Sequence, residues 1–135
     1  MPHAYRIIIA EDDESLASLL TRLILRHYPL VLIQSFSNGR AALAAYDDTR
    51  ADLLFVNHSM PGMDGPTLIR TLRGRGDSVP VIGMSGDLSL YDVYMDAGAM
   101  AFVGGAELVT QLPALLERFL PPASSAFAED FVTIT

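Results

Sequence analysis

The segment at residues 51–66, ADLLFVNHSMPGMDGP, constrains the fold more than any other part of the chain. Its four consecutive apolar residues, at positions 53–56, have the pattern of a strand that is buried on both faces. Asn57 ends this run, and the Pro-Gly and Asp-Gly pairs at positions 61–65 predict a turn before the next helix. Open parallel sheets carry their chemistry just beyond the carboxyl ends of the strands, so Asn57 is a candidate functional residue.

The rest of the chain alternates short apolar runs with amphipathic segments. Besides the central strand, we expect strands at residues 5–10, 30–36, 79–84 and 101–103. The first predicted helix ends near His27, and four more cover residues 40–46, 66–73, 89–97 and 106–120. Pro113 inside the last of these predicts a kink or a late start. Strands and helices that alternate at this spacing predict an α/β fold with a doubly wound parallel sheet.

Size and composition limit the possible classes of protein. A chain of 135 residues predicts one domain at residues 1–120, followed by a tail or linker at residues 121–135 that is rich in Pro, Ala and Ser at its start. There is no cysteine, which excludes disulfides and zinc sites built on sulfur. No apolar run approaches the roughly 20 residues that span a bilayer, and the amino terminus lacks the pattern of a signal peptide. We therefore expect a cytoplasmic protein with no membrane contact.

The charge of the chain argues against some partners. The net charge is −7, and the nine basic residues are all arginine. A negative domain without a basic cluster is not expected to bind nucleic acid by itself. The absence of lysine also excludes Schiff-base chemistry and lysine–phosphate contacts.

The central segment resembles the receiver domains of response regulators, the CheY-like family of two-component signalling. That family has an aspartate after its central strand, then three residues and Pro-Gly-Met-Asp-Gly. This chain has the same motif at positions 61–65, with Asn57 in place of the aspartate. The resemblance covers about residues 5–120 and includes the Asn38-Gly39 turn. It implies a flavodoxin-like (βα)5 sheet with strand order 2-1-3-4-5, and a phosphorelay module that is not itself an enzyme.

The resemblance also implies a degenerate metal site. Glu11 and Asp12 match the acidic pair that helps the family to hold Mg²⁺, together with the acceptor position Asn57 and the backbone carbonyl of Ser59. An amide brings no charge, and losing one charge about 4 Å from a cation costs on the order of a few kcal/mol. We therefore expect no cofactor or only weakly bound Mg²⁺, and a raised pKa at one of the acids. The alternative is that residues 11–14 are only an acidic helix start.

The phosphoryl chemistry is affected more strongly. In the family the aspartate accepts a phosphoryl group, whereas the amide of Asn57 is a poor nucleophile. The family's lysine after the fifth strand is Gly105 here. Ser85 and Phe102 match the family's switch positions on strands four and five, although each could serve ordinary packing.

These observations favour a pseudo-receiver that is not phosphorylated at the usual site and acts by protein–protein interaction. The resemblance implies an interaction face at residues 89–120, from Ser89 to Leu120, with a homodimer as one option. Its predicted apolar contacts are Leu90, Tyr91, Tyr94 and Met95. One alternative is a true phosphoacceptor receiver domain that carries an Asn57 variant, but that would not explain the second loss, at Gly105. The other is a module that binds a small anion or nucleotide above the strand ends.

Overall fold

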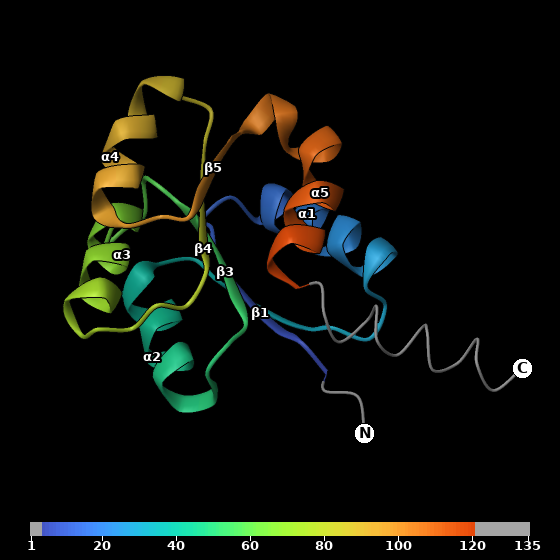
Figure 1. Ribbon diagram of the computed structural model, residues 1–135, viewed down its shortest axis with the longest axis horizontal. Coiled ribbons are helices and arrows are strands. Elements are labelled where there is room, and N and C mark those ends of the chain that lie inside the picture. Colours follow the sequence, from blue (N-terminus) through green and yellow to red (C-terminus); the bar gives the residue numbers. More distant parts are fainter. Residues whose placement is uncertain (1–3, 121–135) are drawn as a thin grey trace, which may run out of the picture.

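A computed structural model describes residues 4–120, and the tail or linker predicted at residues 121–135 lies outside the described residues. Five parallel strands form one sheet in the order β2-β1-β3-β4-β5. Helices cover both faces of this sheet (Figure 1). The predicted α/β flavodoxin-like fold and its strand order are therefore confirmed.

The strands and helices alternate along the chain. The strands are β1 (Arg6–Ala10), β2 (Leu32–Phe36), β3 (Leu53–Asn57), β4 (Val81–Ser85) and β5 (Ala101–Gly104). The α-helices are α1 (Glu14–His27), α2 (Gly39–Thr49), α3 (Gly65–Gly74), α4 (Tyr91–Ala97) and α5 (Leu108–Phe119). Two short 3₁₀ helices, η1 (Leu88–Leu90) and η2 (Gly105–Glu107), precede α4 and α5. None of the helices in residues 4–120 is long and apolar enough to cross a membrane.

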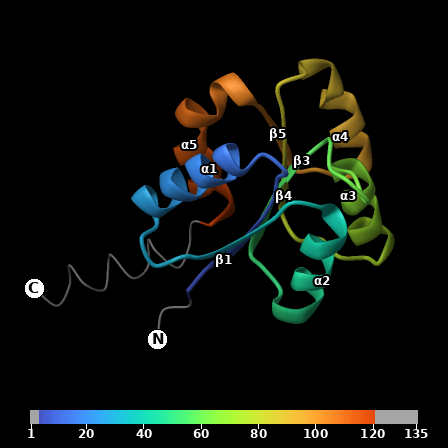
Figure 2. The same cartoon turned by 180° about the vertical axis from the view of Figure 1, so that it is seen from behind.

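The sheet separates two apolar cores because successive side chains of a strand point to opposite faces. In β3, Leu53 and Phe55 pack against α1 and α5, whereas Leu54 and Val56 pack against the side of α2, α3 and α4. All four side chains have an exposed fraction of 0%. Figures 1 and 2 show the two layers, with α1 and α5 together on one side of the sheet. Burial on both faces explains why the central strand reads as a continuous apolar run.

Some predicted boundaries are wrong. The strand expected from Leu30 starts at Leu32, where the Leu32 N–H donates to the carbonyl of Tyr5, and the Leu30 side chain is 84% exposed. The last helix starts at Leu108 because the residues just before it form η2. Pro113 lies inside α5, so the late start amounts to two residues and does not occur at the proline.

Tyr94 is the largest fully buried side chain of the described residues, and Gly83 makes its position possible. A Cβ atom on Gly83 would overlap the Tyr94 ring, so the ring packs directly on the backbone of β4. The Tyr94 hydroxyl lies 3.1 Å from the carbonyl oxygens of both Val56 and Met84. The prediction that Tyr94 supplies apolar surface for a partner is therefore wrong, since this side chain has an exposed fraction of 0%.

Candidate functional site

The carboxyl ends of four strands meet around one cavity of about 340 Å³. Its predicted members follow or end β1, β3, β4 and β5, and they are Glu11, Asp12, Asn57, Ser85 and Gly105. The other lining residues are Asp13, Leu16, Met84, Gly86, Val103, Gly104 and Leu108. Three acids and no basic residue line the cavity. The parallel sheet brings these positions together from distant parts of the sequence, as its topology predicts.

Asn57 is held by the two acids beside it. Its amide nitrogen donates to Glu11 Oε2 at 2.9 Å and approaches Asp12 Oδ1 at 3.4 Å. Only the nitrogen end of the amide can donate to a carboxylate, so the acids fix which end of Asn57 faces them. An aspartate here would put a third carboxylate in the same place. The amide thus supplies N–H groups where the family's acceptor residue has only acceptor oxygens.

The local fold also fixes the backbone of Asn57. A Cβ atom on Gly65 would overlap the Asn57 carbonyl, so the start of α3 approaches β3 more closely than other residues allow. The Gly65 N–H donates to the carbonyl of His58 at 3.0 Å. Asp64 caps α3 by accepting from the N–H of Thr67, and the side chain of Thr67 together with this N–H lowers the pKa of Asp64. The Pro-Gly-Met-Asp-Gly motif therefore serves helix initiation next to the site.

Glu11 is the only buried charged side chain among residues 4–120, with an exposed fraction of 3%. Its Oε2 accepts from Asn57 and from the N–H of Asp13, whereas its Oε1 has no hydrogen-bond partner within the described part of the chain. Burial is the main cause that raises the pKa of Glu11 to about 7, and the neighbouring Asp12 adds to it. The expectation of a raised pKa is confirmed for Glu11, with burial as the larger cause.

The acidic run at residues 11–14 has two separate roles. The Asp13 carboxylate caps α1 by accepting from the N–H groups of Ser15 and Leu16, and Glu14 lies in the first turn of that helix. Glu11 and Asp12 instead contact Asn57. The helix-start interpretation thus holds for Asp13 and Glu14, and Glu11 and Asp12 face the site.

The residues present do not fit a magnesium ion in this arrangement. Mg²⁺ needs oxygen ligands, but Asn57 presents its N–H₂ group to Glu11 and Asp12. No group of three or more His, Cys, Asp or Glu side chains within residues 4–120 could hold a metal ion. Ser59 is exposed, its hydroxyl lies 3.2 Å from Nδ1 of His58, and it does not line the cavity.

Of the three remaining predicted positions, Ser85 and Gly105 lie at this edge of the sheet, and Phe102 lies within β5. The Ser85 hydroxyl accepts from the N–H of Asp87 at 3.0 Å, which closes the turn into η1. Gly105 is exposed, and a Cβ atom there would meet no atom within 4 Å. Phe102 does not line the cavity; it is half-buried and packs on Tyr94 with 5.2 Å between ring centroids.

Sequence reasoning missed the role of Tyr94 near this site. Its hydroxyl contacts the carbonyls of Val56 and Met84, the residues immediately before Asn57 and Ser85. The signal that could have revealed it is Gly83, because a glycine inside a buried strand indicates that another group approaches the backbone. Tyr94 therefore joins α4 to the strand ends that carry two site positions.

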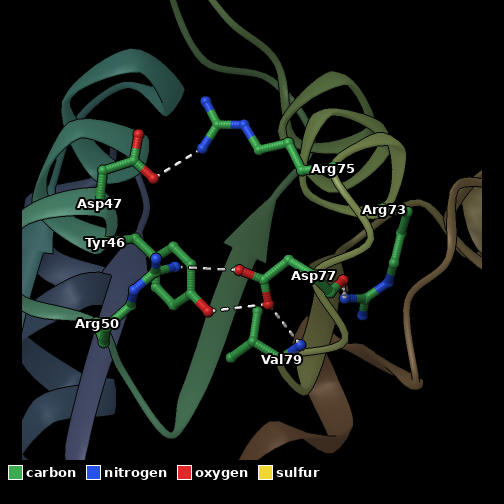
Figure 3. A network of polar contacts seen from close by, with 7 residues as sticks. All are labelled: Tyr46, Asp47, Arg50, Arg73, Arg75, Asp77 and Val79. Carbon is green, nitrogen blue, oxygen red and sulfur yellow. Dashed lines mark hydrogen bonds and ion pairs between the residues drawn. The ribbon is translucent and has the colours of Figure 1, made fainter.

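A second polar cluster lies at the opposite end of the sheet, before β4 (Figure 3). Asp77 Oδ1 accepts from the Tyr46 hydroxyl and the Val79 N–H, each at 3.0 Å, and Asp77 Oδ2 lies 3.3 Å from Arg50. Arg73 donates to the Asp77 carbonyl at 2.8 Å. This cluster contains two arginines, Arg50 and Arg73, beside Asp77, whereas no basic residue lines the cavity.

Comparison with known proteins agrees with the motif and the fold. The sequence pattern of the response regulator receiver domain matches residues 7–112. The chain belongs to this family. It is a receiver domain of two-component response regulators, and the resemblance found in the sequence is confirmed.

Its relatives are longer proteins. Sensory transduction protein RegX3 of Mycobacterium tuberculosis is 34% identical over 119 residues, which cover 83% of this chain and 51% of that protein. Response regulator MprA of the same species is 30% identical over 138 residues, which cover 96% of this chain and 59% of that protein. The chain thus spans about half the length of the curated relatives it matches.

A solved structure supports the same assignment. The receiver domain of a signal transduction histidine kinase from Syntrophus aciditrophicus is 29% identical, with a TM-score of 0.77 over 87% of this chain and 90% of that one. Receiver domains thus occur both in response regulators and in kinases.

Proposed function

We propose that this receiver domain is a pseudo-receiver: it is not phosphorylated at the usual site and acts by binding a protein partner. The observation that carries the proposal is the hydrogen bond from the Asn57 amide nitrogen to Glu11. A phosphoacceptor must attack with an electron pair on oxygen, but this amide is neutral and turns its N–H groups toward the acids. The local contacts stabilise Asn57 as an amide.

The missing cation supports the same proposal. The position of the family's lysine is Gly105, and no basic side chain lines the cavity. A transferring phosphoryl group carries negative charge, which Glu11, Asp12 and Asp13 would repel instead of stabilising. The acceptor aspartate and the lysine are both replaced, by Asn57 and Gly105. Two such replacements favour a natural pseudo-receiver over a phosphoacceptor domain that carries a single Asn57 variant.

We further propose that Mg²⁺ binds weakly or not at all. The proposed ligands would be Glu11, Asp12, the amide oxygen of Asn57 and the carbonyl of Ser59. To offer its oxygen, Asn57 would have to give up its hydrogen bonds to Glu11 and Asp12. Such a rearrangement costs binding energy without adding a charge.

Partner binding through the face between Ser89 and Leu120 is the proposed mode of action, with no enzyme activity of the domain itself. The exposed apolar side chains on this face are Leu88, just before it, and Tyr91, Val93 and Val109. A cytoplasmic location agrees with this role. A homodimer through the same face is the alternative mode.

The test is an attempt to phosphorylate the domain. We expect acetyl phosphate with Mg²⁺ to leave its intact mass unchanged, while Asn57→Asp combined with Gly105→Lys gains one phosphoryl group. The lysine is structurally tolerated because Gly105 has open space at its Cβ and is not among the glycines with positive φ. A stable phosphoryl gain by the natural sequence would disprove the pseudo-receiver proposal.

A further inference from the structure

An exposed apolar patch begins at η1 and continues onto α4. Leu88 is 61% exposed and Tyr91 is 50% exposed. The Tyr91 N–H donates to the Leu88 carbonyl, so the two residues are one helical turn apart and share a face. Large apolar side chains that are exposed next to each other indicate a contact surface more strongly than scattered ones do.

The patch continues from α4 onto β5. The rings of Tyr91 and Phe102 meet edge to face, with 5.8 Å between their centroids. A Cβ atom on Gly104 would lie 2.8 Å from Cδ2 of Leu88 and would also overlap the Glu107 carboxylate. Leu88, Tyr91 and Phe102 thus form one surface, the α4–β5 patch, and Glu107 borders it. Figure 1 shows α4 and β5 side by side at this edge of the sheet.

The stretch of sequence that carries the α4–β5 patch has charges of one sign. Residues 76–117 contain no lysine, arginine or histidine. The acids in this stretch are Asp77, Asp87, Asp92, Asp96, Glu107 and Glu117. Asp87, Asp92 and Glu107 are exposed. Two hydrogen bonds from Ser89 hold the pKa of Asp87 below its usual value, so this carboxylate stays charged.

The acidic cavity extends this negative region. Gly86, Gly104 and Gly105 line the cavity, and each lies two positions along the chain from a residue that forms or borders the patch (Leu88, Phe102 and Glu107). Glu11, Asp12 and Asp13 lie across the same cavity. A partner on the patch would therefore meet a negative potential from both sides.

A second copy of the chain does not complement this surface. In a twofold contact centred on the patch, each acid would face the same acids of the other copy. Like charges at an interface are unfavourable unless basic groups separate them. Arg118 is the first basic residue after this stretch, and it stacks over the ring of Phe119 at the far end of α5.

Resting on the proposed function of partner binding, we propose that the α4–β5 patch binds a segment of another protein that is both apolar and basic. Its apolar side chains would cover Leu88, Tyr91 and Phe102, and its lysine or arginine side chains would pair with Asp87, Asp92 and Glu107. An amphipathic helix with one apolar and one basic face has this chemistry. Binding needs no phosphorylation, because the patch is exposed as the domain stands.

The experiment uses two synthetic peptides with an amphipathic helical pattern, one of leucine and lysine and one of leucine and glutamate. Each is titrated into the ¹⁵N-labelled full chain, with binding measured by calorimetry and mapped by amide shifts. We expect the lysine peptide to bind and to shift residues 87–92 and 102–107, and the glutamate peptide not to bind. Binding should weaken as salt increases.

Variants separate this surface from general attraction to an acidic protein. Leu88→Ser should weaken binding about tenfold, as expected for the loss of one buried leucine. Glu107→Gln should weaken it about threefold and reduce the salt dependence. Two controls should leave the affinity unchanged: Leu30→Ser, an 84% exposed leucine beside the opposite edge strand, and Asp48→Asn, an exposed acid on α2.

The proposal would be overturned if the patch variants and the controls changed the peptide affinity equally. It would also be overturned if the peptide shifted amide signals near all the acids of the chain and not mainly those of the patch. A dimer that Leu88→Ser abolishes, seen by analytical ultracentrifugation, would also overturn it in favour of self-association. Failure here is distinct from failure of the pseudo-receiver proposal. The peptide titration tests the surface, whereas the mass measurement after acetyl phosphate tests the site.

Discussion

The half-buried Asp77 at one end of the sheet and the buried Glu11 at the other have very different partners. At the amino end, Asp77 has a tyrosine hydroxyl, a backbone N–H and the guanidinium of Arg50 as partners. At the carboxyl end, Glu11 has only an amide and one backbone N–H, and its Oε1 is unpartnered among the described residues. The Asp77 carboxylate therefore has partners for both of its oxygens, whereas burial of Glu11 as a carboxylate destabilises the fold.

This difference in hydrogen-bond partners indicates that the acid at the amino end of the sheet stabilises the fold. At the amino end, the Asp77 carboxylate joins α2 to the loop before β4 through its bonds to Tyr46 and Val79 (Figure 3). At the other end, Glu11 keeps one oxygen without a partner among the described residues, and it matches a position that helps the family to hold a metal. Four substitutions can break or sharpen this comparison.

The largest effect is expected for Asp77→Ala. It leaves the Tyr46 hydroxyl, which belongs to a residue only 4% exposed, and the Val79 N–H without their acceptor. We expect the free energy of unfolding to fall by about 3 kcal/mol, measured by urea denaturation. Asp47→Ala is the matched control: it breaks an exposed ion pair with Arg75, which is worth about 0–1 kcal/mol. Equal losses in both variants would show that the cluster is not a structural unit.

The second prediction is that Glu11→Gln stabilises the domain above pH 7. The pKa of Glu11 is raised from 4.5 to about 7, so the folded state keeps a proton that the unfolded state releases between these values. The contribution of Glu11 to the free energy of unfolding is therefore fully present below pH 4.5, and it is lost as the pH rises through about 7. At pH 8 the variant should be more stable by about 2 kcal/mol.

Urea denaturation of both proteins at pH 5 and pH 8 checks this prediction. The glutamine keeps an acceptor oxygen for the Asn57 amide, so the local contact survives. At pH 5 the difference between the two proteins should become much smaller. A natural protein whose stability does not fall across this range would contradict the account of Glu11.

The third prediction concerns Asn57→Asp. This change replaces a donor to Glu11 and Asp12 by a carboxylate that repels them. Without metal, the free energy of unfolding should fall by about 1 to 2 kcal/mol. Magnesium should then restore the stability, because three carboxylates attract the cation. Thermal melts with and without Mg²⁺ measure both effects, with the natural sequence as the control that Mg²⁺ barely shifts.

The smallest effect is expected for Arg50→Gly. Arg50 has a φ of 61° and is the only non-glycine residue with positive φ among residues 4–120. The strained backbone at Arg50 costs of order 1–3 kcal/mol, and a glycine would relieve it. The glycine would also remove the exposed ion pair with Asp77 and the stacking on the Tyr46 ring. The net change should be a stabilisation of about 0.5 kcal/mol in urea denaturation. A clear destabilisation would show that Arg50 contributes more to the Asp77 cluster than an exposed ion pair does.

The sequence by itself determined the fold and the positions of the site. Continuous apolar runs such as that of β3 predict strands buried on both faces, and their alternation with helices predicts a parallel sheet. Strand-end reasoning indicated Asn57, and the family resemblance added Glu11, Asp12, Ser85 and Gly105. Because parallel strands end at the same edge, these five residues line one cavity. The motif at positions 61–65 identified the family because its turn chemistry is local.

Only the tertiary structure decided how those residues interact. The orientation of the Asn57 amide, the burial of Glu11 and the reach of Tyr94 to two strand-end carbonyls depend on neighbours from distant segments. Tyr94 was wrongly predicted to be exposed because its helix is short and its packing partner is the missing side chain of Gly83. The periodicity of apolar residues within one helix cannot reveal that its side chain packs on the backbone of a glycine in a distant strand. Burial and charge balance depend on long-range contacts, which the three-dimensional fold alone determines.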